Sequence, residues 1–231
     1  MYDGSVTAGG RRHAKTVRAA ALAVAATHLA AAVAAFVFIR PGREPETTAE
    51  RAAFVASHAT TWSAAWLLFS VAAVTMVWLA VAMRRLLDPE RTRISLDLGA
   101  ALVGLGAALE IVGHCVSAGV LPVLAAPAAG VTEPTTYRAV ERGLDFVMSV
   151  GGQLGFALGV LLFVIELHRR ALVHRGVTML GFVNAGCGGV LLVAGAVGSA
   201  PASAGAATAV LITVIAFALA LSRSAWLRPA G

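Results

Sequence analysis

The fold is decided by a long apolar run at positions 98–121, LGAALVGLGAALEIVGHCVSAGVL. An α-helix of about 20 apolar residues crosses the hydrocarbon core of a bilayer, so this run is long enough to span one. It is rich in Gly and Ala, which lets helices in lipid pack closely. A β-barrel strand would instead alternate apolar and polar residues over about ten positions. The run therefore predicts a transmembrane helix.

Five further segments have the same character, and the sequence predicts an all-α, polytopic membrane protein. The expected spans are about 17–39, 60–83, 98–121, 143–167, 177–198 and 203–221. We expect the third span to stop at Pro122, because proline interrupts a helix. Segments 40–59 and 125–142 contain Pro, Glu, Thr and Arg and are predicted to be aqueous loops. The link near 199–202 is short enough for a tight hairpin, and the whole chain, 1–231, forms one domain.

The composition excludes an ordinary soluble domain. Hydrophobic residues make up 58% of the chain and charged residues 13%, with a mean hydropathy of +0.82. A soluble protein needs more polar surface than this, whereas lipid solvates apolar faces. The net charge of +6 does not indicate a nucleic-acid partner, because the basic residues lie beside the apolar spans.

The distribution of Lys and Arg predicts that both termini are cytoplasmic, in a multi-pass protein of the plasma membrane. One set of alternate loops holds most of these residues: Arg11, Arg12, Lys15, Arg18, Arg84, Arg85, Arg91, Arg93, Arg169, Arg170, Arg175, Arg223 and Arg228. The other set holds Arg40, Arg43, Arg51, Arg138 and Arg142. A secretory signal is the alternative for the first span, but its apolar run of about 23 residues exceeds the usual signal core, and we expect a retained anchor.

Ionisable groups inside the spans are the main functional indication, because burying them in lipid is costly. Glu110 lies near the middle of the third span, and His114 follows four residues later on the same helical face. Ser117 extends this polar face, which turns apolar at Val103. A carboxyl group in an apolar setting favours its protonated form, so Glu110 and His114 are a candidate acid/base pair or proton relay. The alternative is an interhelical hydrogen bond that fixes packing.

Other polar residues are expected at similar depth. Asp145 lies at the outer end of the fourth span, and Gln153 lies in its outer half. Both could share one outward-opening cavity with Glu110 and His114. Asp145 is the third candidate catalytic residue, and Gln153 and Asn184 are candidate substrate-binding residues. Each could instead form a packing hydrogen bond, and Asp145 could simply favour a helix N-terminus in the headgroups.

A stripe at the start of the second span contains His58, Trp62 and Trp66, spaced four residues apart. Tryptophan prefers the lipid–water interface, so an interfacial belt explains the two tryptophans. The alternative is that the stripe binds substrate at the mouth of the cavity.

The remaining patterns predict packing and anchoring. Gly151, Gly155 and Gly159 form a smooth stripe for close helix contact, either within the bundle or in a homo-oligomer. The cluster at positions 166–170, with Glu166, His168, Arg169 and Arg170, is interpreted as an interfacial anchor. Cys115 and Cys187 lie in apolar spans without CxxC or Cys/His spacing, so no disulfide or metal site is predicted.

Three functions follow from these residues. The first is an enzyme, such as a cyclase or isomerase, that transfers protons to a lipidic or isoprenoid substrate without a cofactor. The second is an electron carrier for haem b or quinone, with His28 and His114 as haem ligands. The third is a proton-coupled transporter or an accessory membrane subunit, with Glu110 and His114 as the relay.

Two resemblances accompany these hypotheses. The stripe at His58, Trp62 and Trp66, and the basic turn at 168–170 before a glycine-rich fifth span, resemble the layout of uncharacterised six-helix bacterial membrane proteins. That resemblance implies architecture and no activity. The intramembrane carboxyl group of Glu110 is similar in kind to those of the small membrane terpene cyclases, which implies an isoprenoid substrate.

Overall fold

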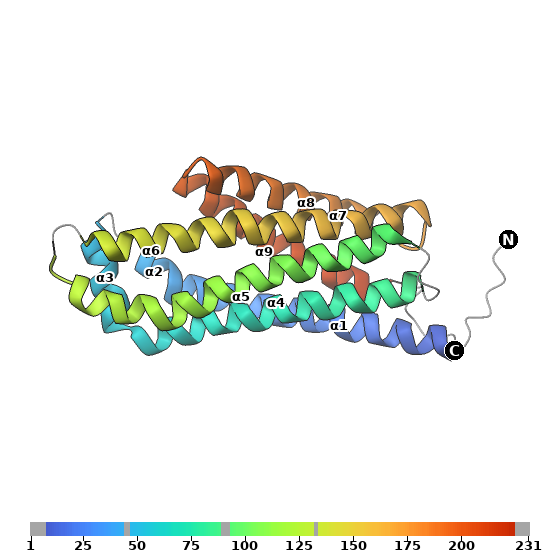
Figure 1. The fold of residues 1–231 in the computed structure, drawn as a ribbon. Helices are drawn as coiled ribbons and strands as arrows, with labels where there is room; N and C mark the ends of the chain where they lie inside the picture. Colours follow the sequence, from blue (N-terminus) through green and yellow to red (C-terminus); the bar gives the residue numbers. More distant parts are fainter. Residues whose placement is uncertain (1–7, 44–46, 89–92, 132–133, 225–231) are drawn as a thin grey trace.

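The computed structural model describes residues 8–43, 47–88, 93–131 and 134–224, and this part of the chain is helical, with no strand (Figure 1). The elements in chain order are α1 (Ala8–Ala34), the π-helix η1 (Ala35–Ile39), α2 (Arg40–Arg43), α3 (Thr48–Ser57), α4 (Ala59–Leu87), α5 (Ile94–Ala128), α6 (Thr135–Phe146), the π-helix η2 (Val147–Gly152), α7 (Gln153–Arg169), α8 (Arg175–Ala196) and α9 (Ala200–Ser222).

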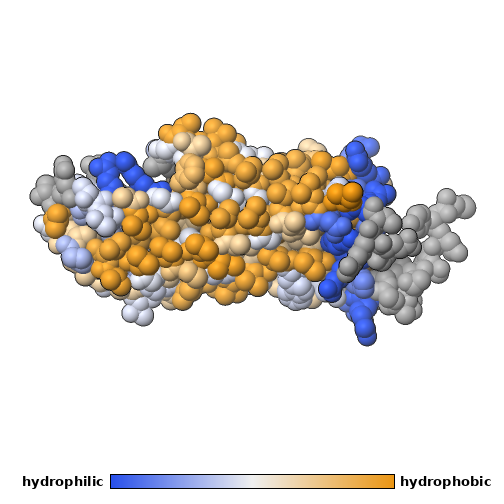
Figure 2. All heavy atoms as spheres, in the orientation of Figure 1, coloured by the Kyte–Doolittle hydropathy of each residue, from blue (hydrophilic) through white to orange (hydrophobic). Residues whose placement is uncertain are grey.

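The six predicted spans are confirmed as helices that are long and apolar enough to cross a membrane. They cover Arg12–Arg43, Ala59–Leu87, Ile94–Ala128, Thr135–Arg169, Arg175–Ala196 and Pro201–Ser222. Their outward faces carry large apolar side chains, such as Leu29, Leu105 and Val112, which are all more than half exposed. Figure 2 shows the resulting hydrophobic band, bounded by hydrophilic residues at the end where α4 ends and α5 begins. This exterior suits lipid rather than water.

The long helices form a closed ring. Each packs against its neighbour in the order α1, α4, α5, α7, α8 and α9, and α9 returns to α1. We call the end with the start of α1 and the end of α9 the terminal end. The opposite end, which carries α2, α3 and the start of α6, is the distal end (Figure 1). Each half of the ring has its own apolar core, and the core of the distal half contains Trp62, Trp66 and Tyr137.

The expected end of the third span is wrong, because α5 continues through Pro122 and Pro127 to Ala128. Proline lacks the N–H that would bond the carbonyl four residues earlier, which here is that of Ala118. Ser63 of α4 donates its hydroxyl to this carbonyl instead. A neighbouring helix therefore satisfies the acceptor that Pro122 leaves free, as is common for proline in membrane helices.

The two segments predicted as aqueous loops are also more ordered than expected. The first contains α3, which packs against α5, and the second contains the start of α6, which runs without a break through η2 into α7. The hairpin between α8 and α9 is confirmed as a tight turn, in which Gly198 adopts a left-handed φ of 70°. This hairpin ends beside η2, since Gly195 lies against Ser149. The start of α6 thus extends past it at the distal end (Figure 1).

Candidate functional site: an acid and an imidazole inside the helix ring

Glu110 and His114 lie on the face of α5 that points into the ring. Leu105 and Val112 on the opposite face are exposed. The side chain of Glu110 is 14% exposed and that of His114 is 3% exposed. His114 Nε2 is 3.4 Å from Glu110 Oε2. One turn of helix therefore places a carboxyl group and an imidazole side by side, as their spacing predicts.

Gln153 completes the pair from a second helix. Its side-chain amide nitrogen donates to Glu110 Oε1 at 2.7 Å, a contact that similar depth in the membrane does not by itself predict. The preceding residue makes room for this contact, because a Cβ on Gly152 would lie 2.5 Å from Glu110 Cγ. Gly152 is also the last residue of the π-helix η2, and such single π turns are frequent at functional sites.

Glycines hold α5 and α7 close enough for this contact. A Cβ on Gly155 would lie 2.6 Å from the Leu102 carbonyl oxygen, and one on Gly159 would lie 2.8 Å from that of Gly99. Two residues of the predicted glycine stripe thus pack inside the ring, while Gly151 lies beside the Leu109 side chain. This is the first of the two uses expected for the stripe.

Aromatic rings form a wall beside His114. The rings of Trp66 and Phe69 lie 5.5 and 5.6 Å from the imidazole, centre to centre. Trp62 packs edge-on against Trp66, and its indole N–H donates to the Ser117 carbonyl oxygen. Both tryptophans are buried between helices, so the interpretation as an interfacial belt is wrong for them.

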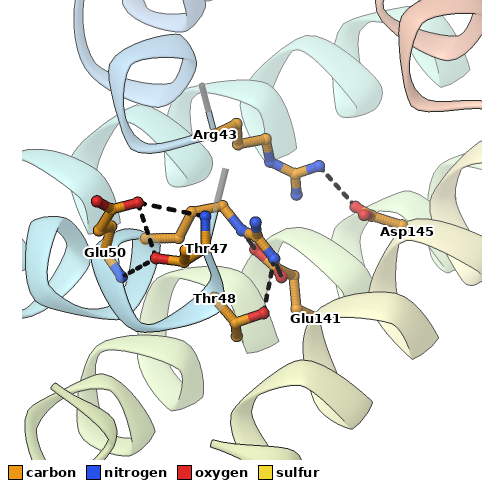
Figure 3. A network of polar contacts seen from close by, with 7 residues as sticks. Arg43, Thr47, Thr48, Glu50, Glu141 and Asp145 are labelled. Carbon is orange, nitrogen blue, oxygen red and sulfur yellow. Dashed lines mark hydrogen bonds and ion pairs between the residues drawn. The ribbon is translucent and has the colours of Figure 1, made fainter. Parts of the chain in front are cut away.

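Two ion pairs lie at the distal end and are drawn in Figure 3. Arg43 of α2 donates to Asp145 of α6 at 2.7 Å, and Arg51 of α3 donates to Glu141 of α6 at 2.9 Å. The Arg43 guanidinium also lies 5.5 Å from the centre of the Trp66 ring. Asp145 is therefore bound to an arginine, and the Trp66 ring lies between that arginine's guanidinium and the His114 ring at 5.5 Å from each.

Sequence reasoning missed Arg43, Arg51 and Glu141 as members of the distal cluster. They lie in segments that were predicted to be loops, where side-chain directions cannot be inferred. The spacing of Glu141 and Asp145 was the available signal, because two carboxylates four residues apart share one face of a helix.

The other predicted site residues lie elsewhere. His58 is exposed, and its ring stacks on Phe54 with centroids 4.2 Å apart. Asn184 donates to the Val210 carbonyl and the Thr213 hydroxyl, so it ties α8 to α9. His28 on α1 has its Nδ1 2.9 Å from the Val24 carbonyl oxygen. Among the residues that the structure describes, no group of three His, Cys, Asp or Glu side chains could hold a metal ion.

A small apolar pocket of about 20 Å³ lies in the ring interior, lined mainly by the core of the terminal half. Helices all around the ring contribute to it, including Val24, Leu79, Val103 and Phe217. Asn184 is its one polar lining residue. At this size the pocket has room for about one water molecule and not for an isoprenoid.

A second charged network closes the terminal end. Glu166 of α7 is 4% exposed and accepts from Arg93 and, at 2.6 Å, from Arg170. Arg84 of α4 donates to Asp97 of α5, also at 2.6 Å. The predicted anchor at 166–170 thus includes a buried carboxylate that binds helices together.

No known family model matches the chain, and no curated protein sequence or solved structure is similar enough to be matched to it. Arguments about function therefore rest on the site itself.

Proposed function

We propose that the chain is a multi-pass plasma-membrane protein with both termini in the cytoplasm, and that Glu110 and His114 transfer protons within it. Six apolar helices support the membrane location. The excess of Lys and Arg at the terminal end supports the orientation, because basic loops stay on the cytoplasmic side. The distal end then faces away from the cytoplasm.

One observation carries the proton-transfer proposal, namely that Glu110, His114 and Gln153 converge inside the ring. Gln153 binds one carboxyl oxygen of Glu110, while the other oxygen faces the imidazole. This arrangement holds one oxygen in place and leaves the second to exchange a proton with His114 Nε2. Glu110 is the proposed general acid, His114 its proton partner and Gln153 a positioning residue.

The surroundings favour an apolar substrate. The Trp66 and Phe69 rings lie beside His114, and aromatic rings attract positive charge such as that which develops on a protonated hydrocarbon. In an isomerisation, the Glu110 O–H bond would break as a C–H bond forms, and a proton lost from a neighbouring carbon would restore the acid. Such a reaction needs no co-reactant, which suits a lipidic or isoprenoid substrate that reaches the site through the bilayer.

The haem alternative is less well supported by the geometry. His28 uses Nδ1 toward a backbone carbonyl, which leaves Nε2 to bind iron. His114, however, directs its Nε2 toward Glu110. Binding haem would require His114 to give up this contact.

The test is to purify the protein in mild detergent and identify the small molecules that accompany it by mass spectrometry. Wild type is compared with Glu110→Gln, which keeps the shape but cannot donate the same proton. Glu141→Gln is the matched control, since it also removes a carboxylate but lies outside the pair. We expect a prenyl or other lipid intermediate that changes in amount or identity only in Glu110→Gln.

If that molecule proves to be a substrate, Glu110→Gln should slow its turnover at least ~100-fold, the lower range for a lost general acid. Two results would overturn the catalytic proposal. Bulk phospholipid alone in all samples leaves no substrate, and a haem absorption band would assign the protein to electron transfer.

A further inference from the structure

Buried polar atoms without partners gather in the distal half of the ring. In the described part of the chain, all but one of the buried side-chain nitrogens and oxygens that lack a hydrogen-bond partner lie there. They are Arg43 Nε, Trp66 Nε1, Ser70 Oγ, His114 Nδ1, Ser117 Oγ and Tyr137 Oη. Folded proteins rarely leave so many such groups unbonded, and ordered water is the usual partner when they do.

Several of these groups lie near one side chain, Trp66. The Trp66 ring lies 5.5 Å from the His114 ring and 5.5 Å from the Arg43 guanidinium. Ser70 follows Trp66 by one turn of α4, and Ser117 follows His114 by one turn of α5. Tyr137 belongs to the same packed cluster as Trp66.

The interior on the other side of Glu110 is apolar except for Asn184, whose amide nitrogen is bonded to α9. Val103, two turns before Glu110 on α5, is buried and lines the small pocket together with Met76, Val160 and Phe217. These side chains have no group that can hold a chain of water molecules. The environment along α5 therefore changes from polar to apolar at the acid/base pair.

We propose that water fills the space around Trp66 and connects the Glu110–His114 pair to the distal side only. The ion pair between Arg43 and Asp145 closes the outer end of this path, because it joins α2 to α6 beside Trp66. The role of this water in supplying protons rests on the proposed function, whereas its presence does not.

His114 is suited to carry the proton along this path. Its Nδ1 is buried without a hydrogen-bond partner among the described residues, and its Nε2 lies 3.4 Å from Glu110 Oε2. When Glu110 is ionised, a hydrated proton from the distal side forms an Nδ1–H bond. The Nε2–H bond then breaks as the Glu110 O–H bond forms, which leaves a neutral imidazole with its proton on Nδ1. Proton and charge both balance, and no other reactant is needed.

The test is the reactivity of single cysteines, since a thiol reacts as its thiolate and therefore needs water. Cys115 and Cys187 are first replaced by serine. Ser117→Cys and Val103→Cys are then introduced separately, because both positions are buried on α5, on opposite sides of Glu110. The probe is a trimethylammonium methanethiosulfonate, which does not cross membranes. It is applied to intact cells and to inverted vesicles.

We expect Ser117→Cys to react from the distal side and Val103→Cys to react from neither side. Adding Arg43→Gln to Ser117→Cys should speed the reaction about tenfold, because it removes the ion pair that closes the path. Ser70→Cys is a second distal position, to be used if Ser117→Cys does not purify as a folded protein.

Two outcomes would overturn the inference. In one, neither Ser117→Cys nor Ser70→Cys reacts even when Arg43→Gln is added, which means that the Trp66 region does not open to the distal side. In the other, Val103→Cys reacts as fast as Ser117→Cys, which means that access is not one-sided. Either result leaves the proposed acid/base role of Glu110 standing, because that role is judged by the Glu110→Gln comparison alone.

Discussion

The two ends of the bundle both contain buried charged residues, but they use them differently. At the terminal end, Glu166 is held by Arg93 and Arg170, and Arg84 binds Asp97. At the distal end, Arg43 and Arg51 are paired as well, yet Trp66, Ser117 and Tyr137 nearby keep buried polar atoms without partners. The first end resembles a structural clasp, and the second has unused hydrogen-bonding capacity.

This difference separates a stabilising role from a functional one. The ion pairs of the terminal end fix the positions of helices, and within the described residues Arg84 Nη2 is the one buried side-chain atom there that lacks a hydrogen bond. A buried polar group without a partner costs free energy. A chain can tolerate that cost where water or a substrate bonds the group. The comparison therefore agrees with the proposal that proton transfer takes place in the distal half, next to Glu110 and His114.

The largest expected effect is at the terminal end, for Glu166→Ala. This change leaves two arginines without their buried partner, which we expect to lower the free energy of unfolding by about 2–3 kcal/mol. Thermal unfolding in detergent measures the loss. Arg93→Ala should cost less, because its side chain is 48% exposed and already reaches water. If Glu166→Ala and wild type unfolded at the same midpoint temperature, the network would not stabilise the terminal end.

A smaller effect is expected at the distal end, for Tyr137→Phe. Tyr137 is 1% exposed, yet its hydroxyl has no partner within the described residues. Removing an oxygen that no protein group bonds should change the free energy of unfolding by less than about 1 kcal/mol. The same thermal unfolding assay measures this change. A loss as large as that of Glu166→Ala would mean that the hydroxyl is firmly bonded, and the contrast between the ends would fail.

Local patterns in the sequence were enough to predict much of this arrangement. Apolar length predicted the six helices, and the spacing of Glu110 and His114 predicted their shared face. The similar depth of Glu110 and Gln153 was predicted as well, whereas their contact was not. These inferences depend only on the geometry of single helices and on the thickness of the bilayer.

Features that depend on distant residues could not be predicted in this way. The extension of α5 past Pro122 depends on Ser63, which lies on another helix. The ion pairs of Arg43 and Arg51 likewise depend on α6, far along the chain. Burial of Trp62 and Trp66 follows from the rotation of α4 about its axis relative to α5. The general preference of tryptophan for the membrane interface does not predict that rotation.

The smallest expected effect concerns the outer surface of the distal end, where polar groups are bonded within the chain. At the start of α3, Thr47 Oγ1 accepts from the Glu50 N–H, and the Glu50 carboxylate accepts from the Thr47 N–H (Figure 3). The hydrogen bonds from Thr47 lower the pKa of Glu50 below its usual value. The folded first turn thus favours the ionised carboxylate more than the unfolded chain does.

The stability that the Glu50 carboxylate adds to α3 is therefore fully present above the pKa of Glu50 in the unfolded chain, which is about 4.3. It disappears as the pH falls through the lower folded value. We expect hydrogen exchange at the first turn of α3 to speed up in acid beyond its intrinsic pH dependence, while the long helices stay protected. Thr47→Ala should remove this extra pH dependence. If acid instead exposed the amides of α5 and α6 together with those of α3, the surface and the interior of the distal end would unfold as one cooperative unit. The contrast between the bonded surface groups and the unbonded groups around Trp66 would then fail.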